Sequence, residues 1–239
     1  MCNHHEKQQI DRRSLFALAG LGLAAAGLGL GVAPAKAAEG QKTALTPDQA
    51  LAALKAGNAR YVADAQSCVV DLAKRRGSVA SHQAPWATIV GCSDSRVPPE
   101  LLFGGLGLGE LFVARNAGNM VDTATMGTVE YGAEVLGSPL LVVLGHEKCG
   151  AVVAACEVVT KKATFPGSIG PMVKPIVPAA TAVRGKPGDF VDNAVRESAK
   201  RTAQRLATAS PILAKLVKEG KLKIVAARYD LDDGKVEYL

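Results

Sequence analysis

Two polar segments hold the residues whose types and spacing could do chemistry. The first places a thiol, a carboxylate and a guanidinium two residues apart, at Cys92, Asp94 and Arg96. The second begins with His146 and carries Cys149 three residues later. Two thiolates and an imidazole are ligands typical of zinc, and three protein ligands leave the fourth position open, as in catalytic zinc sites. We therefore expect a metal centre that can activate a water molecule.

Each segment follows a short apolar run that is typical of a buried strand. Residues 86–90 form the first run and residues 140–144 the second. β-branched and aromatic residues favour strands, and Pro98-Pro99 then ends extended pairing after the first run. If the two strands are neighbours in a parallel sheet, both polar segments lie at its carboxyl edge, where open α/β sheets bind ligands.

These segments, together with a third one, resemble the β-class carbonic anhydrases. The matching stretches are 92–96 (Cys-Ser-Asp-Ser-Arg), 115–119 (Arg-Asn-Ala-Gly-Asn) and 146–150 (His-Glu-Lys-Cys-Gly), and the resemblance runs from about Leu45 to the C-terminus. It implies an α/β fold with a mostly parallel central β-sheet flanked by helices, a long N-terminal helix and a C-terminal hairpin. It also implies reversible hydration of carbon dioxide to bicarbonate and a proton, in a homodimer or homotetramer.

The resemblance assigns one Zn2+ per chain to Cys92, His146 and Cys149. A hydroxide on that metal would attack carbon dioxide, and Asp94 and Arg96 would form a catalytic dyad that gates the metal. Asp94 can either orient the attacking oxygen or occupy the fourth metal position, and a bidentate pair with Arg96 holds it away. The alternative interpretation of this pair is a structural salt bridge at the end of a strand.

The resemblance also gives candidates for the substrate pocket, which are Gln83, Phe112, Ala117, Tyr131 and Gly150. Phe112 and Tyr131 could equally serve in core packing. Gln83 matches a substrate-binding glutamine of the readily active members, so we expect an open metal site near neutral pH. Glu147 and Lys148 flank the ligands without needing to reach the metal, so we assign them no role.

Two other functions could use the same residues. Relatives of this fold hydrolyse carbon disulfide or carbonyl sulfide, and such enzymes are expected to have a restricted access route to the metal. The second alternative is a redox protein in which Cys92 and Cys149 do thiol chemistry. That function would not need Asp94 or Arg96.

The composition restricts the remaining classes of function. The chain has 239 residues, a length that allows one domain with a substantial core, and its net charge is a modest +6. We see no basic stripe interleaved with aromatic residues, so we do not expect nucleic-acid binding. The five cysteines form an odd, scattered set rather than a disulfide framework, and they are Cys2, Cys68, Cys92, Cys149 and Cys156. We interpret Cys68 and Cys156 as small hydrophobic residues.

Residues 1–37 are typical of an export signal. Arg12-Arg13 is a twin-arginine motif, an apolar run follows at 17–32, and Ala35-Lys36-Ala37 supplies two small residues for cleavage. An uncleaved anchor is the alternative. We predict that an export translocase transiently binds the folded chain and delivers it to the periplasm or an equivalent lumen. The catalytic domain of residues 38–239 would then have no stable membrane anchor.

Strands and helices alternate along the rest of the chain, which predicts a parallel sheet. Thr46 and Gln49 have the spacing of a capping box at a helix start. The expected elements are a helix from Pro47, a strand at 110–115, a helix at 123–136, a helix from Ala151, a loop with a short helix at 165–178, a helix at 189–218 broken near Ser210, a strand at 222–229 and a hairpin strand at 236–238.

Overall fold

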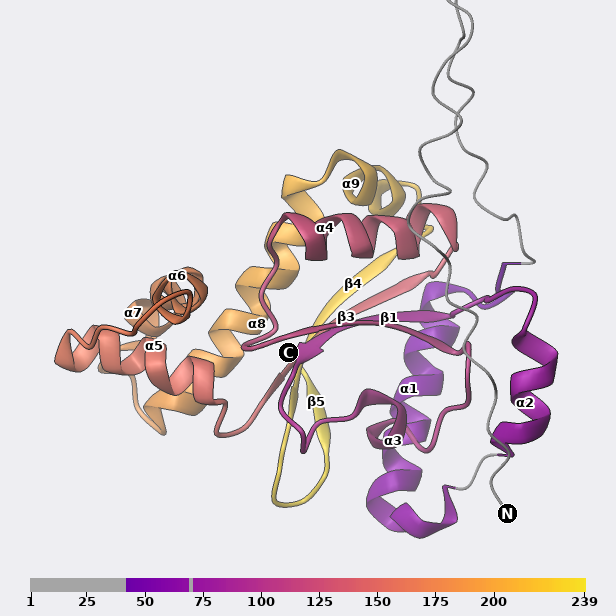
Figure 1. Ribbon diagram of the computed structural model, residues 1–239, viewed down its shortest axis with the longest axis horizontal. Helices are drawn as coiled ribbons and strands as arrows, with labels where there is room; N and C mark the ends of the chain where they lie inside the picture. Colours follow the sequence, from indigo (N-terminus) through magenta and orange to yellow (C-terminus); the bar gives the residue numbers. More distant parts are fainter. Residues whose placement is uncertain (1–41, 69–70) are drawn as a thin grey trace, which may run out of the picture. The chain divides into compact units, whose positions relative to one another are not determined.

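A computed structural model describes residues 42–68 and 71–239 of the chain (Figure 1). The predicted export signal of residues 1–37 lies outside these residues. Among the helices that the structure describes, none has the length and hydrophobicity that crossing a membrane requires. The described elements alternate between strands and helices, as the sequence predicts.

The domain is built on a five-stranded sheet in the order β2-β1-β3-β4-β5. The strands are β1 (Ala87–Cys92), β2 (Leu111–Asn116), β3 (Leu140–His146), β4 (Lys223–Tyr229) and β5 (Val236–Tyr238). The first three pairings in this order are parallel, and β5 runs antiparallel to β4 and closes the predicted hairpin. The predicted fold class is therefore confirmed. Strands β1 and β3 are neighbours, so their carboxyl ends meet at one edge of the sheet.

Helices cover both faces of the sheet. Because successive strand side chains alternate between faces, Ile89 and Val142 belong to one core, and Val90 and Val143 to the other. Two helices pack on the first face, α1 (Pro47–Ala63) and α3 (Pro99–Leu102) (Figure 1). Three pack on the second face, α4 (Thr123–Glu130), α8 (Phe190–Ala209) and α9 (Pro211–Lys218).

Helix α1 begins at the predicted capping box. The Thr46 side chain accepts a hydrogen bond from the Gln49 backbone N–H, and the Gln49 side chain accepts one from the Thr46 N–H. Further along α1, the buried Asn58 amide donates to the Gly234 carbonyl and accepts from the Val236 N–H. One side chain thus ties the N-terminal helix to the β4–β5 hairpin.

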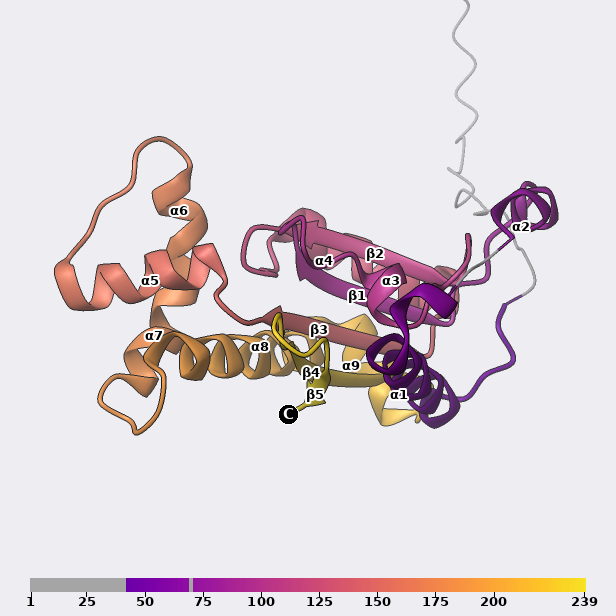
Figure 2. The same ribbon diagram turned by 90° about the horizontal axis from the view of Figure 1, so that it is seen from below.

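A third core lies beyond the carboxyl edge of the sheet (Figure 2). It is formed by α5 (Gly150–Lys161), α6 (Ile169–Val173), η3 (Lys174–Ile176), α7 (Val177–Val183) and the start of α8. Segment 165–178 is more helical than the predicted loop. Pro175 and Pro178 stand in the first turns of η3 and α7, where a missing N–H costs no hydrogen bond. The prolines therefore mark helix starts.

Two predicted helices change form along their length. The helix predicted at 123–136 is α-helical to Glu130 and then continues as a π-helical turn, η2 (Tyr131–Val135). The helix predicted at 189–218 is broken at Ser210 as expected, because the Ser210 hydroxyl caps α9 by accepting from the Leu213 N–H. The remaining short helices are η1 (Ala65–Ser67) and α2 (Leu72–Val79).

Candidate metal centre

The three predicted metal ligands converge at the carboxyl edge of the sheet. Cys92 is the last residue of β1 and His146 is the last residue of β3. Cys149 follows in the next turn, at the N-cap of α5. All three residues are buried, and their candidate ligand atoms lie within 4.8 Å of one another. The sequence prediction that two strand ends bring these side chains together is confirmed.

The geometry of this cluster fits a zinc ion. The Cys92 and Cys149 sulfur atoms lie 4.0 Å apart as free thiols, close to the spacing of about 3.8 Å that two sulfur ligands have on a tetrahedral zinc. The His146 Nδ1 atom lies 2.8 Å from the Glu147 carbonyl oxygen, which makes Nδ1 the donor and leaves a lone pair on Nε2. Among the described residues, none hydrogen-bonds this buried Nε2. A metal would satisfy it.

The two thiols are coupled electrostatically. Their mutual hydrogen bond lowers the pKa of Cys92 and raises the pKa of Cys149. The Gly118 N–H donates to the Cys92 sulfur at 3.4 Å and further favours a thiolate there. Because burial and the first thiolate both oppose ionisation of Cys149, a nearby divalent cation is the charge that would allow both sulfurs to ionise.

Arg96 holds the Asp94 carboxylate through two parallel hydrogen bonds. The Arg96 Nε donates to Oδ1 at 2.9 Å and Nη2 donates to Oδ2 at 2.8 Å. This bidentate pairing keeps the pKa of Asp94 well below its usual range. The Asp94 Oδ2 atom also lies 3.8 Å from the His146 Nε2 atom. The carboxylate is therefore ionised, beside the ligand cluster and turned toward the guanidinium.

Arg115 supports the same segment from the neighbouring strand. Its Nε donates to the Cys92 carbonyl at 2.8 Å, and its Nη2 donates to the Asp94 carbonyl at 2.6 Å. Sequence reasoning included Arg115 in a motif but gave it no role. The signal was its place near the end of a predicted strand, since it pairs in register with Gly91, directly before the first ligand.

Comparisons with known sequences and structures show the family to which the chain belongs. A family model described as carbonic anhydrase matches residues 87–236. Carbonic anhydrase 2 of Mycobacterium tuberculosis is 37% identical over 189 residues, which cover 79% of this chain and 91% of that protein. A solved β-carbonic anhydrase from Coccomyxa, in complex with acetazolamide, has 29% identity and a TM-score of 0.61 and covers 73% of this chain and 81% of that chain. The chain belongs to the β-class carbonic anhydrases.

Two further proteins extend this comparison. The carbonic anhydrase of Mycolicibacterium smegmatis is 38% identical over 191 residues, which cover 80% of this chain and 92% of that protein. A structure of tetrameric β-carbonic anhydrases from Sordaria macrospora has a TM-score of 0.61 at 23% identity and covers 79% of this chain and 95% of that chain. At 23% identity, the likeness to the Sordaria macrospora structure shows a shared fold alone.

In this β-carbonic anhydrase, two of the predicted pocket residues lie at the metal edge. Ala117 directly follows the residue that pairs with Cys92, at the end of β2. Gly150 follows Cys149 as the first residue of α5, and open space surrounds the position that a Cβ would take there. Both residues therefore lie beside the ligand cluster, and their role in substrate binding stays a prediction.

The other three pocket candidates lie toward the opposite end of the strands. The Phe112 and Tyr131 rings contact each other, with centroids 6.1 Å apart. Phe112 pairs in register with Thr88, four residues before Cys92, or about 13 Å along the strand. Gln83 is exposed and precedes the amino end of β1. Within one chain these side chains and the metal ligands lie at different ends of β1, and their role in substrate binding stays a prediction.

Proposed function

We propose that this chain catalyses the reversible hydration of carbon dioxide to bicarbonate and a proton, with one zinc held by Cys92, His146 and Cys149. The observation that supports this function best is the buried Cys–His–Cys cluster, with a bare Nε2 atom, beside a carboxylate that an arginine holds. When bound, zinc supplies Lewis-acid chemistry that lowers the pKa of a water molecule.

Asp94 and Arg96 would orient the reacting water. The ionised Asp94 Oδ2 lies 3.8 Å from His146 Nε2, beside the ligand cluster, and would accept a hydrogen bond from the reacting water. Arg96 engages both carboxylate oxygens, which would hold the carboxylate away from the fourth position of a bound metal. The released proton would leave to water and buffer.

Met120, Ala151 and Ile176 pack in the third core with the two sulfur ligands. These side chains give the cluster an apolar wall on that side. Such a wall suits carbon dioxide, which carries no net charge, and it limits the access of bulk water to the buried thiolates.

The two alternative functions are weaker. The matched family model and the related proteins are carbonic anhydrases, so hydrolysis of carbon disulfide or carbonyl sulfide on the same site is not favoured. A thiol redox function would require neither the ion pair of Asp94 with Arg96 nor a buried His146 Nε2 atom without a hydrogen-bond partner among the described residues.

The proposed function is tested by zinc analysis and a carbon dioxide hydration assay on the purified chain and on Cys92→Ala. We expect about one zinc per wild-type chain and rapid hydration. Cys92→Ala should lose zinc and activity, because two remaining protein ligands hold the metal poorly. Full zinc occupancy in Cys92→Ala would show that the ligand set is wrong, and hydrolysis of carbonyl sulfide without carbon dioxide hydration would favour the alternative substrate.

We also propose that the active form is a homodimer or homotetramer. Strand β2 is an edge strand, and two copies related by a two-fold axis would set their β2 strands antiparallel. The amino end of one β2, where Phe112 lies, would then face the carboxyl end of the other. This arrangement would let Gln83 and Phe112 of one chain approach the metal edge of a second chain.

A further inference from the structure

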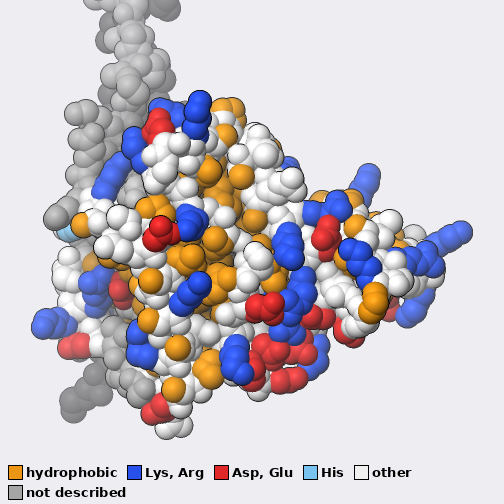
Figure 3. Space-filling model, turned by 180° about the vertical axis from the view of Figure 1, so that it is seen from behind, with side chains coloured by type: hydrophobic (Ala, Val, Ile, Leu, Met, Phe, Trp, Pro, Cys, Tyr) orange, Lys and Arg blue, Asp and Glu red, His pale blue; other side chains and the backbone are white. Residues whose placement is uncertain are grey.

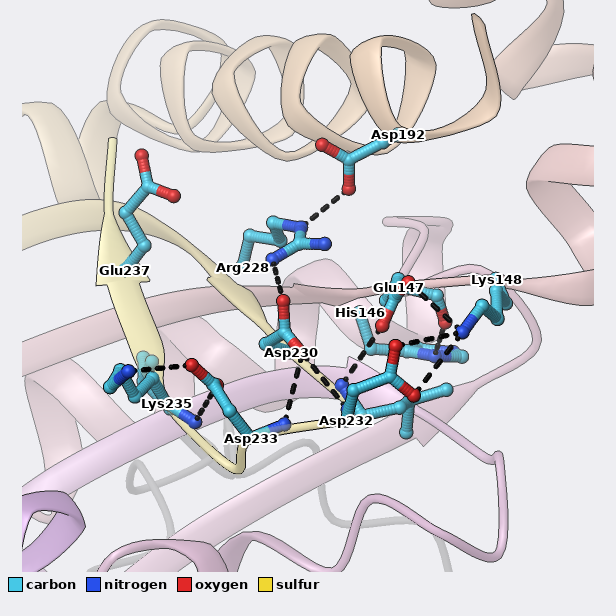
Figure 4. A network of polar contacts seen from close by, with 12 residues as sticks. His146, Glu147, Lys148, Asp192, Arg228, Asp230, Asp232, Asp233, Lys235 and Glu237 are labelled. Carbon is cyan, nitrogen blue, oxygen red and sulfur yellow. Dashed lines mark hydrogen bonds and ion pairs between the residues drawn. The ribbon is translucent and has the colours of Figure 1, made fainter. Parts of the chain in front are cut away.

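The turn from His146 to Cys149, which carries two of the proposed zinc ligands, has one residue in an unfavourable backbone conformation. Lys148, between His146 and Cys149, has φ +52°, in the left-handed region that residues other than glycine rarely adopt. The orientation of the peptide groups in this turn sets the position of both ligands. Glu147 also stands between the ligands, and its contacts run in two directions (Figure 4).

Toward the metal, the backbone of Glu147 fixes the imidazole ligand. The Glu147 carbonyl accepts from His146 Nδ1 at 2.8 Å, which sets the tautomer with Nε2 free to bind a metal. The Glu147 N–H donates to the Tyr229 carbonyl at 2.9 Å and extends the pairing of β3 with β4 by one residue. The peptide group that orients the ligand is therefore attached to the sheet.

Away from the metal, the Glu147 carboxylate contacts the turn between β4 and β5. Its Oε2 accepts from the Leu231 N–H at 3.2 Å, and its Oε1 pairs with the Lys148 ammonium at 3.1 Å. The same ammonium lies 3.2 Å from Asp232. The Glu147 side chain is 17% exposed and that of Asp232 is 75% exposed. Because exposed ion pairs contribute little, the inner contact with Leu231 is the stronger tie.

Hydrogen bonds and ion pairs hold the β4–β5 turn that the Glu147 carboxylate contacts. Asp230 Oδ1 accepts from the N–H groups of Asp232 and Asp233, at 2.9 and 3.2 Å. Asp230 Oδ2 pairs at 2.7 Å with Arg228, a buried guanidinium that Asp192 of α8 also holds. Figure 3 shows acidic and basic side chains beside one another on the face seen from behind. The turn is therefore fixed by its own ion pairs, and the Leu231 N–H is directed to Glu147.

We propose that Glu147 is a positioning residue of the metal centre: its carboxylate, seated on the β4–β5 turn, holds the peptide carbonyl that orients His146. This inference rests on the proposed zinc-dependent function. Glu147 touches neither the metal position nor the substrate, so it acts through His146. Removing the carboxylate frees the ligand turn to relax from the strained conformation at Lys148.

Zinc affinity, measured by competition with a chelator, tests this role in the full-length chain. Glu147→Ala should weaken zinc binding up to about 10-fold, the lower end of the range for losing a direct ligand-orienting partner, because the carbonyl that holds His146 stays and only its support is lost. It should also change the visible absorption of the cobalt-substituted protein. Glu147→Gln keeps an oxygen that accepts from the Leu231 N–H, so it should restore most of the affinity. Glu197→Ala is the matched control, because that partly exposed carboxylate pairs with Arg201 within α8.

Wild-type zinc affinity and an unchanged cobalt spectrum in Glu147→Ala would overturn the inference while leaving the proposed function intact. If Glu147→Ala does not fold, Glu147→Asp replaces it, because the shorter side chain keeps the charge but draws back from Leu231. Wild-type affinity in Glu147→Asp would equally overturn the inference. A wild-type chain that binds no zinc would overturn the proposed function and this inference with it.

Discussion

Arg96 and Arg115 hold the first polar segment in different ways. Arg96 binds the Asp94 side chain, and Arg115 binds the carbonyls of Cys92 and Asp94. The Arg96 side chain is 54% exposed, so its hold on Asp94 depends more on two aligned hydrogen bonds than on charge alone. Lysine offers no planar pair of donors and would not replace it.

The gating role of Arg96 is tested by Arg96→Ala. The variant should keep its zinc but lose about 100-fold or more in kcat/KM for carbon dioxide hydration, the range expected when a positioned polar group is lost. The reason is that the freed Asp94 lies close enough to His146 Nε2 to turn toward the metal.

Zinc analysis and stopped-flow hydration measure this outcome. Arg76→Ala, which removes an exposed arginine of α2, is the control and should keep wild-type kinetics. The gate hypothesis fails if Arg96→Ala turns over normally while its crystal structure shows Asp94 still directed away from the metal.

At the scale of the elements, α1 and α3 meet at a glycine. A Cβ added at Gly57 would lie 2.0 Å from the Phe103 carbonyl oxygen, which is closer than atoms can approach. Gly57→Ala should therefore lower the free energy of unfolding by about 1–3 kcal/mol, as overpacking of a core does.

Gly77→Ala is the matched control for this prediction. Gly77 lies inside α2, with nothing within 4 Å of the added Cβ. That change should raise the free energy of unfolding by about 0.5–1 kcal/mol through helix propensity. Urea unfolding of the three proteins gives both values. Equal stability of Gly57→Ala and the wild type would contradict the close approach of α1 to α3.

Helix starts and breaks were predicted well, because the residues that cause them are neighbours in the sequence. The capping box at Thr46 depends on two residues three apart and the break at Ser210 on the adjacent Pro211, so both could be recognised without a structure. The prolines at 175 and 178 were ambiguous, since proline suits both loops and the first turn of a helix.

The predicted metal ligands could also be found from the sequence, because they lie in polar segments at the ends of two apolar strands. The residues that hold these segments in place could not be found in this way. Glu147 contacts Leu231, which lies 84 residues further along the chain, and no local spacing signals that contact. The same holds for Arg115, whose partners are backbone carbonyls that any residue offers.

At the scale of the whole molecule, we propose export of the folded chain by a twin-arginine route. If the chain reached an oxidising compartment unfolded, Cys92 and Cys149 could form a disulfide before they bind zinc. Folding before export would allow zinc to be bound first, and Arg12-Arg13 matches the pair of arginines that such a route reads. The mature chain would begin near residue 38, in the periplasm or an equivalent lumen.

Replacing Arg12 and Arg13 with lysine tests this proposal. Cell fractionation with a hydration assay should find active enzyme retained in the cytoplasm, because the route reads the arginine pair. A variant with Lys7→Arg, which alters a basic residue outside the pair, should be exported normally. Undiminished export of active Arg12→Lys/Arg13→Lys enzyme would rule out the twin-arginine route.

The proposed chemistry depends on one zinc in each chain, held by Cys92, His146 and Cys149. X-ray absorption at the zinc edge of the purified protein tests it most directly, because sulfur and nitrogen ligands scatter differently. We expect one zinc per chain with two sulfur ligands at about 2.3 Å and lighter ligands at about 2.0–2.1 Å. A protein without zinc, or a first shell made only of nitrogen and oxygen, would contradict it.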